Sequence, residues 1–120
     1  MSTTKVIRYV RPFTEDTGRL SNLGGATFVF DMDYTTREVV ARFSICSSED
    51  NFSKELGLKQ AYANPTARKF NLDRFQEFAH KEGGFVDAYI AMLETDRVRG
   101  ELAAAEKNLL RKMDEQGLIR

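Results

Sequence analysis

Two runs of alternating apolar and polar residues constrain this chain most strongly. Residues 27–33 place Phe28, Phe30 and Met32 on one side, and residues 38–46 alternate in the same way. A period of two with aromatic and β-branched residues predicts strands, and the short polar segment between the runs predicts a hairpin. Because an isolated hairpin is marginally stable in water, its apolar face has to be covered by other elements.

The segments around the hairpin extend this prediction to a whole domain. Residues 4–11 form a β-rich run that ends at a proline, which has no amide hydrogen to donate. Residues 14–25 are dense in turn-forming residues and predict a loop. We therefore expect one α+β domain over residues 1–120, with a three-stranded antiparallel sheet in residues 1–46 and helices in residues 47–120.

The helical part begins with two short elements. Residues 47–50 read Ser-Ser-Glu-Asp, a pattern typical of a helix N-cap followed by acids in the first turn, and this helix is predicted to run to about Ala63. It has to stop before Pro65, because a proline disfavours helical backbone in the preceding residue. Asn71 is expected to cap a second helix that ends at a Gly-Gly pair beginning at Gly83.

Residues 85–116 predict one long C-terminal helix, since they carry apolar residues at helical spacing, among them Val98, Leu109 and Met113. Such a helix would be about 45 Å long, whereas a domain of this size measures about 28 Å across. Part of the helix would have to project or pack on a second chain, which predicts an oligomer. The alternative is a break near residues 96–100 and two shorter helices.

Composition narrows the class of protein. The chain has 18 basic and 18 acidic residues, so its formal net charge is zero. This balance argues against binding of extended nucleic acid, which relies on many phosphate contacts. Cys46 is the only cysteine and excludes an intrachain disulfide. Neither a signal-peptide core nor an apolar stretch of about 18 residues is visible, so we expect no membrane partner and a cytoplasmic protein.

The residues that commonly carry chemistry are sparse. His80 is the only histidine, and its place near a helix end favours a surface position over a catalytic one. One cysteine and one histidine do not supply the four ligands of a zinc site. Asp31 and Asp33 share a strand face, which favours a solvated hairpin end over a metal or acid–base pair. We therefore expect no enzyme activity, no catalytic residue, no metal site and no cofactor.

Basic and aromatic residues indicate binding of an anionic ligand. Guanidinium groups match phosphate geometry, and an aromatic ring offers a stacking face to a base. The predicted loop 68–71 combines both in Arg-Lys-Phe-Asn, and the alternative is a solvated loop that Phe70 anchors to the core. The ligand-binding candidates from this reasoning are Arg8, Arg42, Lys54, Arg68, Phe70 and Asn71.

A short motif lies within residues 40–61, VARFSICSSEDNFSKELGLKQA. A strand ends in a Cys-Ser pair, and Asp-Asn-Phe-Ser-Lys and a glycine follow. These residues are Cys46, Ser47, Asp50, Asn51, Phe52, Ser53, Lys54 and Gly57. The motif covers about one sixth of the chain and resembles that of the phage anti-Thoeris sponge proteins.

The resemblance implies a function. Sponge proteins sequester cyclic ADP-ribose-type signals made by bacterial TIR-domain enzymes, and some also hold cyclic trinucleotides of cGAS-like defence systems. It implies a phage anti-defence protein in the host cytoplasm that holds a small cyclic nucleotide without cleaving it, assembled as a homodimer or trimer of dimers. Asn51 of the motif joins the ligand-binding candidates, which already include Lys54. Relatives often carry arginine after the motif glycine, where this chain has Leu58, and this departure puts a second ligand in doubt.

Two other functions stay open. The first is a phage protein that inhibits a host protein by direct contact, for which mixed surface helices are equally suited. The second is an enzyme that degrades a cyclic nucleotide, which would need His80 as its base.

Overall fold

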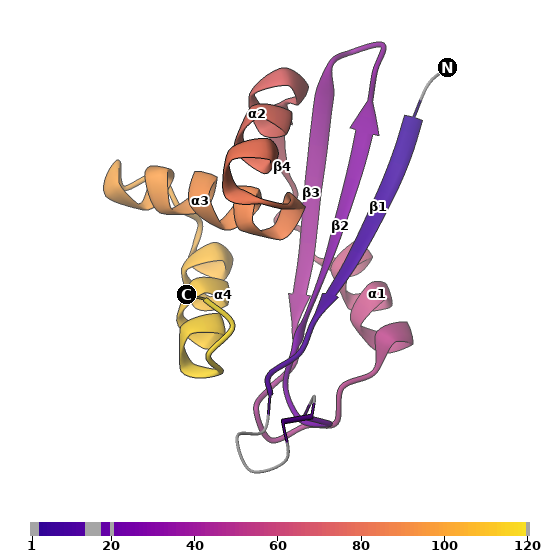
Figure 1. Cartoon of the computed structure of the whole chain (residues 1–120), viewed down its shortest axis with the longest axis vertical. Coiled ribbons are helices and arrows are strands. Elements are labelled where there is room, and N and C mark those ends of the chain that lie inside the picture. Colours follow the sequence, from indigo (N-terminus) through magenta and orange to yellow (C-terminus); the bar gives the residue numbers. More distant parts are fainter. Residues whose placement is uncertain (1–2, 14–17, 20, 120) are drawn as a thin grey trace.

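The computed structural model describes residues 3–13, 18–19 and 21–119 (Figure 1). Over these residues it contains one four-stranded antiparallel sheet and four helices, which confirms the α+β class. The strands, in sheet order, are β1 (Thr3–Val10), β2 (Ala26–Asp33), β3 (Glu38–Ile45) and β4 (Arg68–Asn71). The helices are α1 (Lys54–Ala63), α2 (Leu72–Glu82), α3 (Phe85–Val98) and α4 (Ala104–Glu115).

The predicted hairpin is confirmed. β2 and β3 pair with Phe28 opposite Phe43, and the turn between them is closed by Asp33, whose Oδ1 accepts from the amides of Thr35 at 2.8 Å and Thr36 at 3.2 Å. Asp31, by contrast, forms an ion pair across the strands. The two carboxylates that share a face thus have separate structural partners. Of the predicted loop 14–25, residues 14–17 and 20 lie outside the described residues.

The expected three-stranded sheet is wrong by one strand, because residues 68–71 form β4 and not a loop. β4 pairs antiparallel with β3, with Phe70 opposite Val39. Phe70 is buried against the core while Lys69 is exposed, which is the alternation of a strand. The segment is too short for its period to be recognised in the sequence, and it lies within the part that was expected to be helical.

The expected long C-terminal helix is also wrong, and the alternative of a break is confirmed. α3 ends at Val98 and α4 begins at Ala104, with Gly100 between them at a φ of 72°. This left-handed conformation suits glycine and stops a helix. α3 has 14 residues and is about 21 Å long, so it fits within a molecule of 45 × 32 × 27 Å. The length argument for an oligomer therefore no longer holds.

The other predicted helix boundaries are partly right. α1 does not begin at residues 47–50; it begins at Lys54, where the Ser53 hydroxyl accepts from the Leu56 amide at 3.1 Å. Its predicted end at Ala63 is confirmed. Asn71 caps α2 as predicted, since its side-chain oxygen accepts from the Arg74 amide at 3.0 Å.

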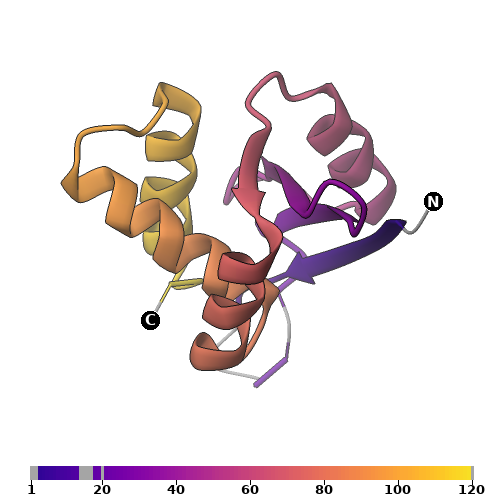
Figure 2. The ribbon, with the colours of Figure 1, turned by 90° about the horizontal axis from the view of Figure 1, so that it is seen from above.

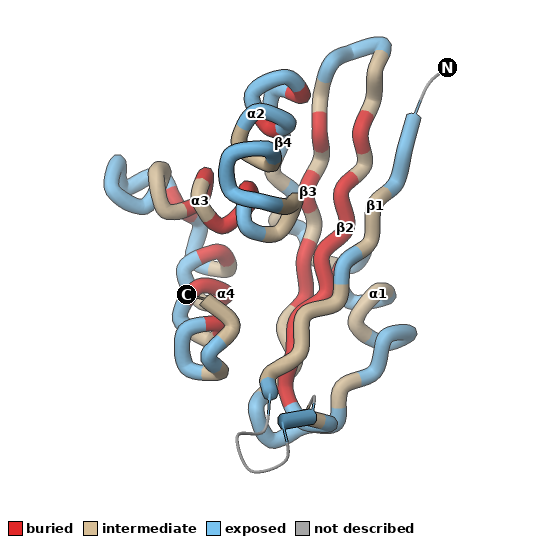
Figure 3. Tube along the Cα trace, in the orientation of Figure 1, coloured by how far each residue is buried: buried red, intermediate tan, exposed pale blue. Residues whose placement is uncertain are grey.

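Helices lie on both faces of the sheet. Figures 1 and 2 show α2, α3 and α4 on one side and α1 on the other. On the larger side Phe28 and Phe30 pack against Tyr89 of α3, which confirms that helices cover the apolar face of the hairpin. Figure 3 shows that the buried residues gather along β2, β3 and the helix surfaces that face them. Val98 is an exception to its predicted stripe, since it is 89% exposed.

A buried ion network fastens α4 to β4 and α3. Glu106 is 1% exposed, and its carboxylate accepts from the Arg68 guanidinium through two bonds of 2.6 Å. It also accepts from the Ala103 amide at 2.9 Å, so it serves the first turn of its own helix. Arg68 donates in addition to Asp96 of α3 at 2.7 Å. One side chain of β4 thus joins the two C-terminal helices.

Candidate functional site

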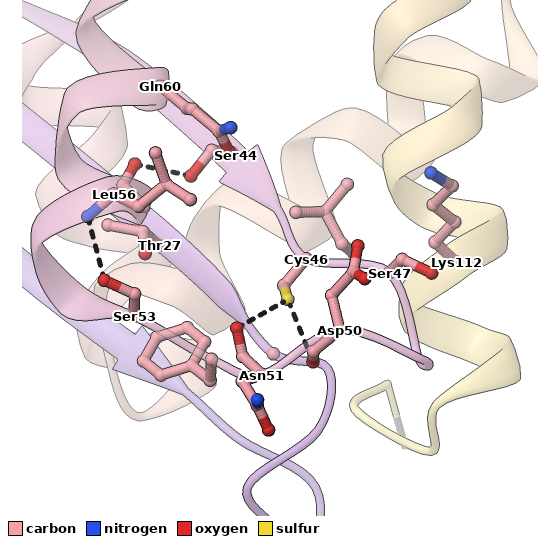
Figure 4. A pocket seen from close by; sticks show the side chains of 14 residues that line it. Thr27, Ser44, Cys46, Ser47, Asp50, Asn51, Ser53, Leu56, Gln60 and Lys112 are labelled. Carbon is pink, nitrogen blue, oxygen red and sulfur yellow. Dashed lines mark hydrogen bonds between the residues drawn. The ribbon is translucent and has the colours of Figure 1, made fainter.

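A cavity of about 360 Å³ lies where the beginning of β2, the end of β3, residues 46–53 and α1 meet, and one side chain of α4 completes it (Figure 4). We call it the motif cavity, because every residue of the motif except Lys54 lines it. Its volume falls within the range of about 300–1,000 Å³ that is usual for small-molecule sites.

Gly57 allows α1 to lie close against the sheet beside this cavity. A Cβ atom at this position would be 2.3 Å from Thr27 Oγ1 and 3.3 Å from Thr27 Cβ. The Ser44 hydroxyl donates to the Gly57 carbonyl oxygen at 2.6 Å and holds the helix in this position. The motif glycine is therefore required by a close helix–sheet contact that forms one wall of the cavity.

The Thr27 hydroxyl is a polar group in the lining without a protein partner. The residue is 1% exposed, and its Oγ1 is buried with no hydrogen bond. An unpaired buried hydroxyl costs about 1–3 kcal/mol, and a hydroxyl can both donate and accept.

Three ionisable side chains line the cavity: Cys46, Asp50 and Lys112. The Cys46 thiol donates to the carbonyl oxygens of Asp50 at 3.4 Å and Asn51 at 3.6 Å. Burial raises the pKa of this thiol, the backbone of Gly24 opposes the rise, and of the two charged groups Asp50 adds to it while Lys112 opposes it. The thiol is thus protonated near neutral pH and suited to donate, whereas a cysteine nucleophile has a depressed pKa.

Only one of the predicted ligand-binding residues lines the motif cavity, namely Asn51. Lys54 follows the motif loop, and its ammonium lies 5.1 Å from the centre of the Tyr9 ring. The Arg42 guanidinium, on β3, donates to Asp31 at 2.8 Å.

The remaining candidates lie elsewhere. Arg8 is next to the Phe85 ring, 5.8 Å from its centre and on the opposite face of the sheet. Phe70 stacks on Phe75 in the core, Arg68 is held in the ion network and Asn71 caps α2. Three of the four side chains of the predicted patch 68–71, those of Arg68, Phe70 and Asn71, therefore have structural partners.

Sequence analysis missed three residues of this region: Thr27, Lys112 and Gln116. Thr27 fits the alternating pattern of its strand like any other residue, so the sequence gives no sign that its hydroxyl is unpaired. Lys112 and Gln116 lie about 60 residues beyond the motif in the sequence, and only the fold of α4 brings them to it. The exposed His80 lies on α2. Among the described residues no group of three or more His, Cys, Asp or Glu side chains forms a metal site.

The chain has no match among models of protein families, curated proteins or solved structures. In the part of the chain that the structure describes, no helix has the length and apolar character needed to cross a membrane.

We expect Gly57→Ala to destabilise the protein by about 1–3 kcal/mol, the usual cost of overpacking. The added methyl group would meet the Thr27 side chain, so α1 would have to move away from the sheet. Chemical denaturation measures the loss. Gly18→Ala is unsuitable as a control because of its positive φ, whereas Ser48→Ala in the loop is expected to change stability by less than about 0.5 kcal/mol. Equal effects of the two substitutions would contradict the close contact.

Proposed function

We propose that this protein binds and sequesters a small cyclic nucleotide signal of the cyclic ADP-ribose class in the motif cavity, without cleaving it. The observation that carries the proposal is that the residues of the motif, apart from Lys54, surround one cavity. The motif is the basis of the resemblance to phage sponge proteins. If the motif binds a ligand, its residues have to face the same cavity, and all of them but Lys54 do.

The chemistry of the lining supports a nucleotide ligand. Lys112 offers an ammonium group to a phosphate, and the amide of Asn51 can pair with a base or a ribose. The protonated Cys46 thiol and the exposed His80 on another element favour holding a ligand over attacking it.

The resemblance also supplies the biological part of the proposal. On this basis we propose that the chain is a phage anti-defence protein, which acts in the host cytoplasm as a homodimer or trimer of dimers. Cyclic oligonucleotides are the second ligand class to test. Leu58 stands where relatives often carry arginine, so binding of this second class is the point at which the chain is expected to differ from them.

The test is a thermal melt with a TIR-derived cyclic ADP-ribose isomer. A ligand at 100 times its dissociation constant that binds only the folded state adds about 2.7 kcal/mol of stability. For a domain of this size the melting midpoint then rises by several degrees. Heating and mass analysis of the released molecule should return the intact signal.

Matched variants place the ligand. Lys112→Ala should reduce the shift, while Lys107→Ala on the exposed side of the same helix should leave it unchanged. If mass analysis instead finds a cleaved product, the protein is an enzyme and does not sequester the signal. No shift with cyclic ADP-ribose isomers or with cyclic oligonucleotides would discard the proposal and leave contact with a host protein.

A further inference from the structure

Gln116 inserts its side-chain amide between the ends of β2 and β3. The last residue pair of the β2–β3 ladder is Ala26 and Ile45, and the next residues outward are Gly25 and Cys46. The Cys46 amide still donates to the Gly25 carbonyl oxygen at 2.8 Å. The Gly25 amide, however, donates to Gln116 Oε1 at 2.8 Å, and Gln116 Nε2 donates to the Cys46 carbonyl oxygen at 2.9 Å.

A primary amide is the group that fits this position. The contact needs an acceptor for the Gly25 amide and a donor for the Cys46 carbonyl, and an amide supplies both from one side chain. The fit is close, since a Cβ atom on the neighbouring Gly24 would come within 2.4 Å of Gln116 Oε1. Gln116 is thus a bridge between the end of α4 and the two strand ends that line the cavity.

The bridge fixes more than its own side chain. Gln116 follows the last residue of α4, and its backbone N–H donates to the Lys112 carbonyl oxygen at 3.0 Å. Residues four apart on a helix lie on one face, one turn above the other. Lys112 is therefore carried to the cavity by the same turn that Gln116 anchors, and Figure 4 shows it on α4 across from Ser47 and Asp50.

We propose that Gln116 is a positioning residue for the motif cavity, which holds the last turn of α4 against Gly25 and Cys46 and so keeps the Lys112 ammonium at the cavity as its anion-binding group. The part that concerns an anionic ligand rests on the proposed function. The part that concerns the position of Lys112 does not, and it can be tested on the protein alone.

The single cysteine provides a ligand-free test. The charged groups that face the Cys46 thiol are Asp50, on its own loop, and Lys112, on α4. The rate of alkylation by iodoacetamide against pH gives the thiol pKa. Lys112→Ala should raise this pKa in the wild-type background and have no effect in the Gln116→Ala background, since the ammonium has already left. Comparing the two backgrounds cancels any change that Gln116→Ala makes in the hydration of the thiol.

Two outcomes of this cycle would overturn the proposal. One is an equal rise on Lys112→Ala in both backgrounds, which means that Lys112 keeps its position without Gln116. The other is no rise in either background, which means that the ammonium is not held at the cavity. Gln76→Ala, at an exposed position of α2, is the matched control and should leave the thiol pKa and the Lys112 effect unchanged.

The same cycle with a nucleotide separates this proposal from the proposed function. Lys112→Ala should weaken binding of a cyclic ADP-ribose isomer by about 10- to 100-fold in the wild-type background and have little effect with Gln116→Ala. If the wild-type protein binds no nucleotide, the proposed function is wrong. The comparison of thiol pKa values in the two backgrounds then still decides the role of Gln116. If Gln116→Ala does not fold, Gln116→Met replaces it, because it keeps a side chain of similar length, adds no charge beside the thiol or Lys112, and loses both the acceptor for Gly25 and the donor for Cys46.

Discussion

We expect Glu106→Ala to lower the free energy of unfolding by about 3 kcal/mol, the lower end of the range for breaking a buried ion pair. Glu106 is 1% exposed and accepts two bonds of 2.6 Å from Arg68. Those bonds raise the pKa of the Arg68 guanidinium, which stays charged in the variant. The loss is at the lower end because Arg68 keeps its bond to Asp96. Urea denaturation with an unchanged m-value measures it.

Two further variants separate the ion pair from other effects. Glu101→Ala removes an exposed carboxylate close to the same turn and should cost less than about 0.5 kcal/mol, since Arg68 contacts only the backbone oxygen of this residue. Arg68→Met combined with Asp96→Leu and Glu106→Leu replaces the whole ion network by apolar side chains and should recover most of the stability. If Glu101→Ala and Glu106→Ala cost the same, the buried pair is not what holds α4.

Phe30→Ala should cost about 3–5 kcal/mol, as expected when a fully buried aromatic side chain is truncated. The Phe30 ring is 0% exposed and lies within 5.4 Å of Phe75, 5.7 Å of Phe85 and 6.0 Å of Tyr89, centre to centre. One strand residue thus contacts both α2 and α3, so its loss leaves a cavity between the sheet and two helices. The change in the denaturation midpoint measures the cost.

Val98→Ala is the control for this core. Val98 continues an apolar stripe in the sequence, yet it is 89% exposed at the end of α3. Its truncation should change stability by less than about 0.5 kcal/mol. A cost similar to that of Phe30→Ala would mean that α3 and α4 form one helix that buries this side.

The hairpin was predictable because its signal is local and strong. β2 and β3 are each long enough for the period of two to be counted, and Asp33 closes the turn between them. β4 offers only four residues, of which Phe70 alone points to the core. Its strand character comes from pairing with β3, and a single short sequence does not contain that information.

The break between α3 and α4 depends on a balance that the sequence did not resolve. Helix-forming residues follow Gly100, and one glycine costs a helix only about 1 kcal/mol. The burial of Leu102 in the linker and of Glu106 on a separate α4 outweighs a continuous helix. Tertiary contacts therefore decided against the local preference, and the ion network is one of them.

The candidate site was predicted in part. The motif loop was singled out, and Asn51 lines the cavity. Arg68 and Phe70 were chosen for their residue types, whereas the fold uses them for an ion pair and an aromatic stack. Lys112 and Gln116 carry no signature, since a lysine and a glutamine near a helix end are typical of any surface helix.

The pairing of Arg68 with Glu106 also bears on the order in which the chain folds. The two residues are separated by 38 positions, and their contact requires both β4 in the sheet and the break between α3 and α4 at Gly100. Because the entropy of closing such a long loop has to be overcome before the contact stabilises the chain, we infer that this pair forms after the folding transition state. We therefore expect Glu106→Ala to speed unfolding by most of its equilibrium effect and to leave the refolding rate nearly unchanged. Stopped-flow measurement of both rates would show whether this pair slows the unfolding of the protein by holding α4 in place.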